Sequence, residues 1–477
     1  PPEAGRPAAG GSADRVSVAM LLPPRSGLTP FSDDAFKLSR WSTAETLVVL
    51  DEAGDARPGL ATAWEQLDPT TWRFAVRGGV RFHDGTALTA GQVAAALTAA
   101  TRASPQPRIL DGVDLTAEVD PGAPDAVLVR TAVADPLVPQ RLSSPQLSVL
   151  AAAAYRPDGV VDPVGHGTGP FELVGVDGTS GATLDRFDGY WGSPARVAGV
   201  DVDFVPDGTA RAAALRTGTA DVVEAVPVSQ AGLLDPAQVF EVPMPRTNTL
   251  YLNTARGPFS DPALRAAARD AVDRERIVDG VYEGRADVAQ GLLGPALPWA
   301  AAGRPSRTET PAGKPAGTPI VLATFTDRAE LPEVAVQLEQ QLEAAGFDVR
   351  QEVREYAQIE ADALAGTFDA FVLSRATVLD SGDPVAYLYS DFACEGSFNI
   401  SQLCDPAIDA ALQRAAATPT GEDRRAAVLA AERLVLESDA AIPMLHERVV
   451  QGESGDVTGV ARDPRERELI TARTAPR

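Results

Sequence analysis

Short alternating or continuous apolar stretches in the first half of the chain predict strands separated by helices and turns. In each predicted strand, apolar and polar residues alternate or a short run is continuously apolar. These strands lie at 15–22, 45–50, 72–76, 126–133, 200–205 and 222–226. Helices are predicted at 90–100 and 209–216. Thr89 and Gln92 form a capping-box pattern before the first helix, and Gly218 stands where a left-handed cap is expected after the second. The first half is therefore predicted to be mixed α and β.

The alternation of strands and helices is clearer in the second half. Apolar runs predict strands at 320–325, 349–353 and 368–373, and helical spacing predicts helices at 330–345, 359–365 and 422–437. The Asp-Pro pairs at 261–262 and 405–406 predict two further helix starts, with aspartate as the cap and proline at the first helical position. Strands that alternate with helices are typical of a parallel or mixed sheet. The predicted fold class is therefore α/β.

Composition narrows the classes of partner. The 477 residues are enough for two or three domains. The 42 basic and 66 acidic residues give a net charge of −24, which argues against nucleic acid and against charge-driven binding to anionic membranes. No apolar run is long enough for a membrane-spanning helix. Residues 1–14, rich in Pro, Gly and Ala, are predicted to be a disordered tether of a mature chain whose targeting segment has been removed.

Motifs for catalysis or metal binding are missing from the sequence. There is no GxSxG elbow, no phosphate-binding GxxxxGK[ST] loop and no GxGxxG after a strand. His83, His166 and His446 are scattered singly, without the spacing of a zinc site. His83 is interpreted as a turn residue and His446 as a core residue. We therefore expect no cofactor, no protein-ligated metal and no enzyme activity, with a hydrolase as a remote alternative.

A stretch near the end of the second half carries the best candidate binding chemistry. Aromatic residues gather around Gly/Asp turns between 380 and 404. Asp380 and Asp383 follow a predicted strand, where ligands bind in open α/β sheets, although a solvated turn would have the same sequence. Cys394 and Cys404 have nine residues between them, a spacing that suits either a disulfide or two free thiols.

Several recognisable motifs follow one another along the chain. They are PGLATAW at 58–64, WRF at 72–74, VRFHDGT at 80–86, GTGPF at 167–171, RFDGYWG at 186–192, DGTARAAALRTGTADV at 207–222, LNT at 252–254 and GPFSDP at 257–262. In this order the chain resembles the family 5 extracellular solute-binding proteins of ABC importers, the group that binds dipeptides, oligopeptides and nickel. The resemblance covers about 16–464.

The resemblance implies a two-lobe periplasmic binding protein of type II, with the large three-subdomain cluster C architecture and a hinge between the lobes. Lobe 1 would have its core in 15–42, 163–248 and 446–477 and an extra subdomain in 43–162. Lobe 2 would comprise 249–445. The chain would cross between the lobes near 242–249 and 442–446. Pro58, Trp64 and Trp72 of the signature block would shape lobe 1 rather than touch the ligand.

The resemblance also implies the ligand chemistry. In the peptide binders an aspartate at the position of Asp380 pairs with the amino terminus of the peptide, which suits a charge-assisted bond. Thr377 stands where the dipeptide binders carry a tryptophan. The cysteines match a pair in the dipeptide binders, which implies a Cys394–Cys404 disulfide. Further candidate walls of the cleft are Trp41, Tyr251, Tyr387, Tyr389, Phe398 and Asn399.

Alternative ligands remain open at this point. The compact first-lobe insertion and residues 253–255 also resemble the nickel-binding branch, in which Arg102, Arg108 and Trp41 would hold the carboxylates of a metal chelate. An oligosaccharide would favour stacked aromatics. Asp380 has no counterpart in the nickel branch, so we predict a peptide or similar small amphoteric solute, carried to an ABC permease. We also expect a monomer outside the cytoplasm, with a lipid anchor on a cysteine preceding the tether.

Overall fold

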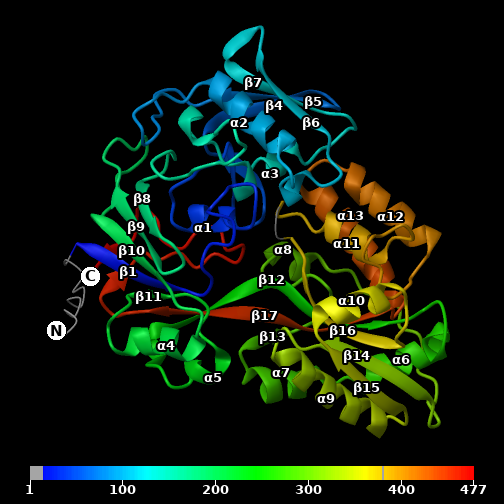
Figure 1. Cartoon of the computed structure of the whole chain (residues 1–477). Coiled ribbons are helices and arrows are strands. Elements are labelled where there is room, and N and C mark those ends of the chain that lie inside the picture. Colours follow the sequence, from blue (N-terminus) through cyan, green and yellow to red (C-terminus); the bar gives the residue numbers. More distant parts are fainter. Residues whose placement is uncertain (1–13, 379–380) are drawn as a thin grey trace.

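The computed structural model describes residues 14–378 and 381–477. Its main feature is one large mixed sheet (Figure 1). The order of its strands is β15 (Asp348–Arg354), β14 (Pro319–Phe325), β16 (Ala370–Ala376), β12 (Val239–Leu252), β17 (Ala441–Glu453), β11 (Val222–Val223), β1 (Arg15–Met20), β10 (Gly199–Phe204), β9 (Gly181–Arg186) and β8 (Phe171–Asp177). A further strand, β13 (Ala286–Val288), pairs with β17. The predicted tether, apart from Asp14, lies outside the described residues, as does Asp380.

Two long antiparallel strands, β12 and β17, connect the halves of this sheet. Their first stretch of pairing runs from Val239 opposite Gly452 to Pro243 opposite Arg448. The register then shifts, and pairing resumes with Thr247 opposite His446. Prolines have no N–H for a ladder hydrogen bond, which explains an interruption at a segment that contains Pro243 and Pro245.

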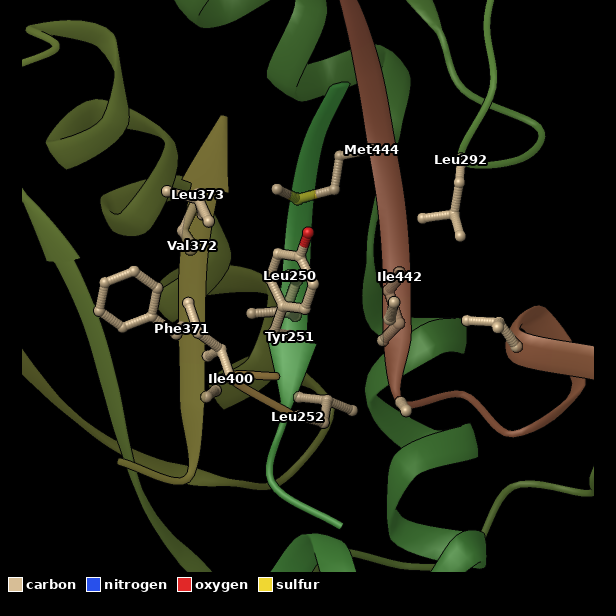
Figure 2. Packing of buried hydrophobic residues seen from close by; sticks show 14 of the residues in the cluster. Leu250, Tyr251, Leu252, Leu292, Phe371, Val372, Leu373, Ile400, Ile442 and Met444 are labelled. Atoms are coloured by element: carbon tan, nitrogen blue, oxygen red, sulfur yellow. The ribbon is translucent and has the colours of Figure 1, made fainter. Parts of the chain in front are cut away.

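The half of the sheet around β14, β15 and β16 holds the largest apolar core. β14 is parallel to both of its neighbours, and α9 (Glu330–Ala344) packs on all three strands. Figure 2 shows residues of β12, β16 and β17, among them Tyr251, Phe371 and Ile442, meeting in this core. The other helices of this half are α6 (Pro262–Ala271), α7 (Arg274–Tyr282), α8 (Pro298–Gly303), α10 (Tyr356–Leu364), α11 (Val385–Phe392), α12 (Pro406–Ala417) and α13 (Glu422–Glu437).

The other half of the sheet is built around β1, which is parallel to both β10 and β11. The helix α4 (Gly208–Arg216) connects β10 to β11 and is followed by Gly218 in the left-handed region, as the sequence predicts. Val18, Phe171 and Leu184 belong to the core of this half. Its remaining helices are α1 (Ala35–Arg40) and α5 (Val228–Ala231).

A separate four-stranded sheet lies beside this half and has its own apolar core. Its order is β4 (Ala61–Asp68), β5 (Thr71–Val76), β7 (Ala123–Thr131) and β6 (Leu115–Asp120), and α2 (Ala90–Arg102) packs on β6 and β7. Trp64 and Trp72 are partly buried against this core. The smaller elements nearby are the hairpin of β2 (Val48–Leu50) with β3 (Ala56–Pro58) and the helix α3 (Val138–Arg141). Two further short strands, β18 (Val457–Thr458) and β19 (Ala475–Pro476), pair with each other.

The predicted helix starts are confirmed by their caps. The Thr89 hydroxyl accepts the N–H of Gln92 at 3.1 Å at the start of α2. Asp261 and Asp405 each accept a backbone N–H two residues on, at 2.9 and 2.8 Å, with proline in the first turn of α6 and α12.

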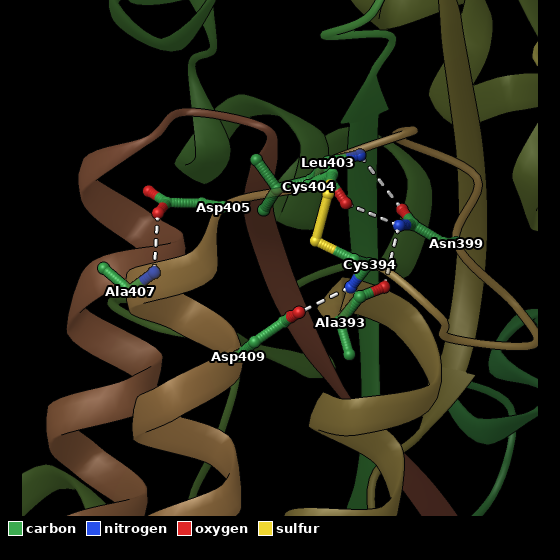
Figure 3. The surroundings of a disulfide bond; sticks show 8 residues. All are labelled: Ala393, Cys394, Asn399, Leu403, Cys404, Asp405, Ala407 and Asp409. Carbon is green, nitrogen blue, oxygen red and sulfur yellow. Dashed lines mark hydrogen bonds between the residues drawn. A yellow bond between two sulfur atoms is a disulfide. The ribbon is translucent and has the colours of Figure 1, made fainter.

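A disulfide closes the loop between α11 and α12. The sulfur atoms of Cys394 and Cys404 are bonded, and the Asp409 carboxylate accepts the N–H of Cys394 at 2.9 Å (Figure 3). Asn399 holds the same loop through hydrogen bonds to and from its backbone. The disulfide is the pairing implied by the family resemblance.

Replacing both cysteines with alanine should lower the free energy of unfolding by about 2–3 kcal/mol, because a closed loop of this length restricts the unfolded chain. The measurement is urea unfolding of the double variant beside the oxidised and the reduced wild type. The reduced wild type should match the variant. A change below about 0.5 kcal/mol in both would contradict a stabilising role.

Candidate functional site

The carboxyl ends of the parallel strands in both halves of the sheet face the crossing of β12 and β17. In one half, β16 ends with Ala376 opposite Arg246 of β12. In the other half, β11 runs antiparallel to β17 and ends with Val223 opposite Gly452, so that it also points toward the crossing. Open α/β sheets bind ligands outside the carboxyl ends of their strands. The space between these two facing edges is therefore the candidate site.

A buried carboxylate organises the charged groups on the edge formed by β12, β14 and β17. Glu447 accepts a hydrogen bond from the Asn248 amide at 3.1 Å and from the Arg328 guanidinium at 3.2 Å. The Arg246 guanidinium lies 3.7 Å from the same carboxylate and donates to the Ser374 carbonyl at 3.2 Å. Burial lowers the pKa of Arg246, and the neighbouring Arg328 lowers it further. Two cations thus share one carboxylate, which leaves this edge with a local positive excess.

A second buried ion pair lies on the opposite face of the same edge. Asp391 has no exposed surface. It accepts three hydrogen bonds from Arg375, at 3.1, 2.9 and 2.8 Å, and one from the Tyr251 hydroxyl at 3.1 Å. The Arg375 guanidinium stacks on the Phe398 ring, 4.1 Å from its centroid. Burial raises the pKa of Asp391, and the hydrogen bonds from Arg375 and Tyr251 oppose that rise. The pair therefore ties the end of β16, which carries Arg375, to α11, which carries Asp391.

The edge formed by β1 and β11 carries its own ion pair. Glu224, the residue after β11, accepts the N–H of Leu21 at 3.0 Å and forms an ion pair with Arg40 at the end of α1. Glu466 lies near Arg40 and also near Arg246. Charged groups from both sides of the crossing therefore meet at this point.

Three of the predicted cleft residues surround the Arg375–Asp391 pair. Tyr251 contacts Asp391, Phe398 lies under Arg375, and Tyr387 is buried with its ring 6.1 Å from that of Phe392. Burial raises the pKa of both tyrosines.

The other predicted residues lie elsewhere. Trp41 has no exposed surface; it donates to the sulfur of Met20 at 3.0 Å and is a core residue. Asn399 is engaged within the disulfide loop. Arg102 is exposed, and Arg108, also exposed, forms an ion pair with Asp33 at 3.1 Å.

Tyr389 is exposed by 39%. Asp380 lies outside the described residues, between Val378 and Ser381, which are both buried.

Sequence reasoning missed the charged residues of the two edges. Arg328 and Arg375 follow the predicted strands at 320–325 and 368–373, and a search for charges at strand ends would have found them. Glu447 and Glu466 have no such signal, because they reach the site from the far end of the chain.

The β2–β3 hairpin contacts α13. The Arg425 guanidinium donates to the Asp55 carboxylate at 2.7 Å. A side chain on Gly54 would come within 3.3 Å of the Gly382 carbonyl, so the two backbones nearly touch. A pocket of only about 30 Å³ remains between them, room for a water molecule or two. The four-stranded-sheet side and the α13 side are therefore closed on each other here.

Asp55→Asn should loosen this contact. Exposed ion pairs contribute only about 0–1 kcal/mol to stability, so the thermal midpoint should hardly change. Backbone hydrogen exchange at 53–55 and 382–383 should accelerate, because the groups that shield these segments separate more often. Asp423→Asn, an exposed acid in the first turn of α13, is the matched control. Unchanged exchange in Asp55→Asn would contradict the contact.

Arg375→Met should lower the free energy of unfolding by about 3–5 kcal/mol, because it leaves the buried Asp391 carboxylate without its cation. Replacing both residues, Arg375→Met with Asp391→Leu, should recover most of that loss. Urea unfolding measures both. A single variant as stable as the wild type would show that Asp391 is not ionised in the folded protein.

Comparisons with known proteins identify the family. The model of the bacterial extracellular solute-binding proteins, family 5 Middle, matches residues 55–399, well over half of the chain. The glutathione-binding protein GsiB of Shigella dysenteriae is 25% identical over 415 residues, which cover 82% of this chain and 80% of that protein.

Solved structures share the fold. A nickel ABC transporter protein from Bacillus halodurans superposes with a TM-score of 0.83 at 24% identity, over 97% of this chain and all of that one. The periplasmic binding protein DppA from Helicobacter pylori, in complex with the peptide STSA, gives 0.71 at 20% identity, over 97% and 98% of the two chains.

The described residues contain no group of three or more His, Cys, Asp or Glu side chains able to hold a metal ion. In the same part of the chain, no helix has the length and apolar character needed to cross a membrane.

From the family model and the solved structures, the fold is the two-lobe α/β fold of periplasmic binding proteins, and the chain belongs to family 5 of the extracellular solute-binding proteins of ABC importers.

Proposed function

We propose that the protein captures a peptide or similar small amphoteric solute between its lobes and delivers it unaltered to the permease of an ABC importer. The observation that supports this proposal is the opposite charge of the facing edges. Arg246 and Arg328 share Glu447 on one side, whereas Glu466 approaches from the other. A solute that carries both an ammonium and a carboxylate group can pair with both sides, since charge-assisted hydrogen bonds are the strong ones.

The names of similar proteins support the same class of ligand. GsiB is a glutathione-binding protein, and DppA from Helicobacter pylori is in complex with the peptide STSA. Both ligands are short peptides with amino and carboxylate groups. The motifs that would indicate an enzyme are missing from this sequence, and its net charge of −24 disfavours nucleic acid.

A metal chelate is the second candidate, because the nickel transporter protein from Bacillus halodurans has the same fold with a TM-score of 0.83. Arg246 and Arg328 would hold the carboxylates of the chelating molecule, as bidentate guanidinium groups do. A chelate needs few ligands from the protein, so the missing cluster of metal-ligating side chains among the described residues does not count against it.

The setting of the protein is part of the proposal. We infer that it works outside the cytoplasm as a monomer, held at the membrane by a lipid anchor and a tether at 1–14. These inferences rest on the family resemblance and on the composition of the tether.

Native mass spectrometry of the protein purified from rich medium tests the ligand class, since such clefts often retain their solute. Fragmentation of the released ligand then identifies it. A retained peptide supports the proposal, and a nickel or iron chelate supports the second candidate. A retained sugar would contradict the proposal. Failure of the wild type to bind trialanine and glutathione at millimolar concentration would contradict it as well.

Asp380→Asn should weaken the binding of trialanine and glutathione by about tenfold or more, because a charge-assisted bond to the amino terminus contributes about 1.5–3 kcal/mol. Isothermal titration calorimetry measures the affinity. Asp177→Asn, an exposed carboxylate at the end of β8, is the control and should bind as the wild type does. Equal affinity in Asp380→Asn would remove Asp380 from the site.

A further inference from the structure

Glu466 differs from the other carboxylates between the two edges because no side chain or N–H of the described residues pairs with it. Glu224 has Arg40, Glu447 has Arg328, and Asp391 has Arg375 as ion-pair partners. The Glu466 carboxylate is partly buried and takes part in no hydrogen bond or ion pair within 14–378 and 381–477. Removing a carboxylate from water without a partner is unfavourable, so this arrangement calls for an explanation.

The turn that carries Glu466 is held firmly by its neighbours. One oxygen of Asp463 accepts the N–H of Arg465 at 3.0 Å, and the other accepts the N–H of Arg467 at 2.9 Å. Glu466 itself has a φ of +56°, in the left-handed region that side chains other than glycine rarely adopt. Such a conformation persists only where the surroundings impose it, and residues of this kind cluster at functional sites.

The two flanking arginines anchor this turn to distant segments. Arg465 donates to the carbonyls of Asp51 and Glu52 in the β2–β3 hairpin. Arg467 donates to the carbonyl and the hydroxyl of Ser143, at 3.1 and 2.8 Å. Both guanidinium groups are buried. The position of Glu466 is therefore fixed by the protein before any solute arrives.

The charges that face Glu466 come from four elements. Arg40 of α1 and Arg246 of β12 favour its ionised form, whereas Glu224 after β11 and Asp463 of its own turn oppose it. Burial has the largest effect, and the pKa of Glu466 is raised above its usual value. Both arginines are already engaged, Arg40 with Glu224 and Arg246 with Glu447. The missing partner is a cation.

We propose that Glu466 selects peptides that carry a basic side chain, by binding the ammonium or guanidinium group of that side chain. This inference rests on the proposed function. A peptide's amino terminus already has a predicted partner in Asp380, so a second cationic group is the one left for Glu466. A preorganised carboxylate that is short of a partner gains a full charge-assisted bond when the cation arrives.

Calorimetry with four tripeptides tests this inference: trialanine, Lys-Ala-Ala, Ala-Lys-Ala and Ala-Ala-Lys. The wild type should bind one of the lysine peptides about tenfold more tightly than trialanine, the effect of one charge-assisted bond. Glu466→Gln, which keeps the shape of the side chain, should lose this preference, so that trialanine and the lysine peptides bind it with equal affinity. The thermal midpoint of the variant, compared with that of the wild type, shows whether it is folded.

A matched control lies on the same turn. Glu468 is exposed, and Glu468→Gln should keep the preference for lysine. If the preference falls equally in both variants, the effect belongs to the overall charge of the turn and the inference is wrong.

The pH dependence supplies a readout that a purely structural role would not move. A protonated Glu466 cannot pair with a cation, so the preference of the wild type should shrink as the pH falls through the raised pKa of the free carboxyl. Glu466→Gln should show no such dependence.

The outcomes separate the two proposals. Equal affinity of the wild type for trialanine and for all lysine peptides overturns the role of Glu466 and leaves peptide binding standing. Failure of the wild type to bind any of the four peptides overturns the proposed function, and the inference with it.

Discussion

The pairing of β12 with β17 is the constraint on which the rest of the structure depends. These strands belong to both halves of the sheet (Figure 1). Their register shifts between Pro243 and Thr247. β12 runs antiparallel to β16 in one half, and β17 runs antiparallel to β11 in the other. The carboxyl ends of the parallel strands on both sides therefore face the crossing. A rotation of one half relative to the other would be absorbed by the few unpaired residues at the shift. The location of the candidate site follows from this topology.

Charge balance then distinguishes the groups that support the site from those available to a solute. Glu447 and Asp391 are buried carboxylates, and each is fully served by arginines and by a neutral donor. Breaking either pair would leave a buried charge alone, so both serve the fold. Glu466 has the same chemistry, but its turn is held in place by backbone and arginine contacts, while its carboxylate has no partner among the described residues. The contrast between these carboxylates supports a structural role for the first two and a binding role for the third.

The sequence predicted the local structure well where local rules decide it. The caps of α2, α6 and α12 and the bounds of α13 follow from short-range hydrogen bonding and helical periodicity. β12 could not be predicted as one strand, because Pro243 and Pro245 break its pattern while its pairing comes from a partner 200 residues away. Trp41 shows the same limit: an aromatic side chain suits a core as well as a cleft, and only the packing decides.

Small-angle X-ray scattering of the wild type, with and without a saturating peptide, tests most directly the claim that the two lobes close around a solute at the β12–β17 crossing. The account predicts that the radius of gyration decreases on addition of trialanine or of the peptide retained by the purified protein. The scattering curve of the complex should match the curve calculated from the present structure, in which Asp55 and Arg425 are in contact. An unchanged radius of gyration, with the peptide shown to be bound in the same sample, would contradict closure.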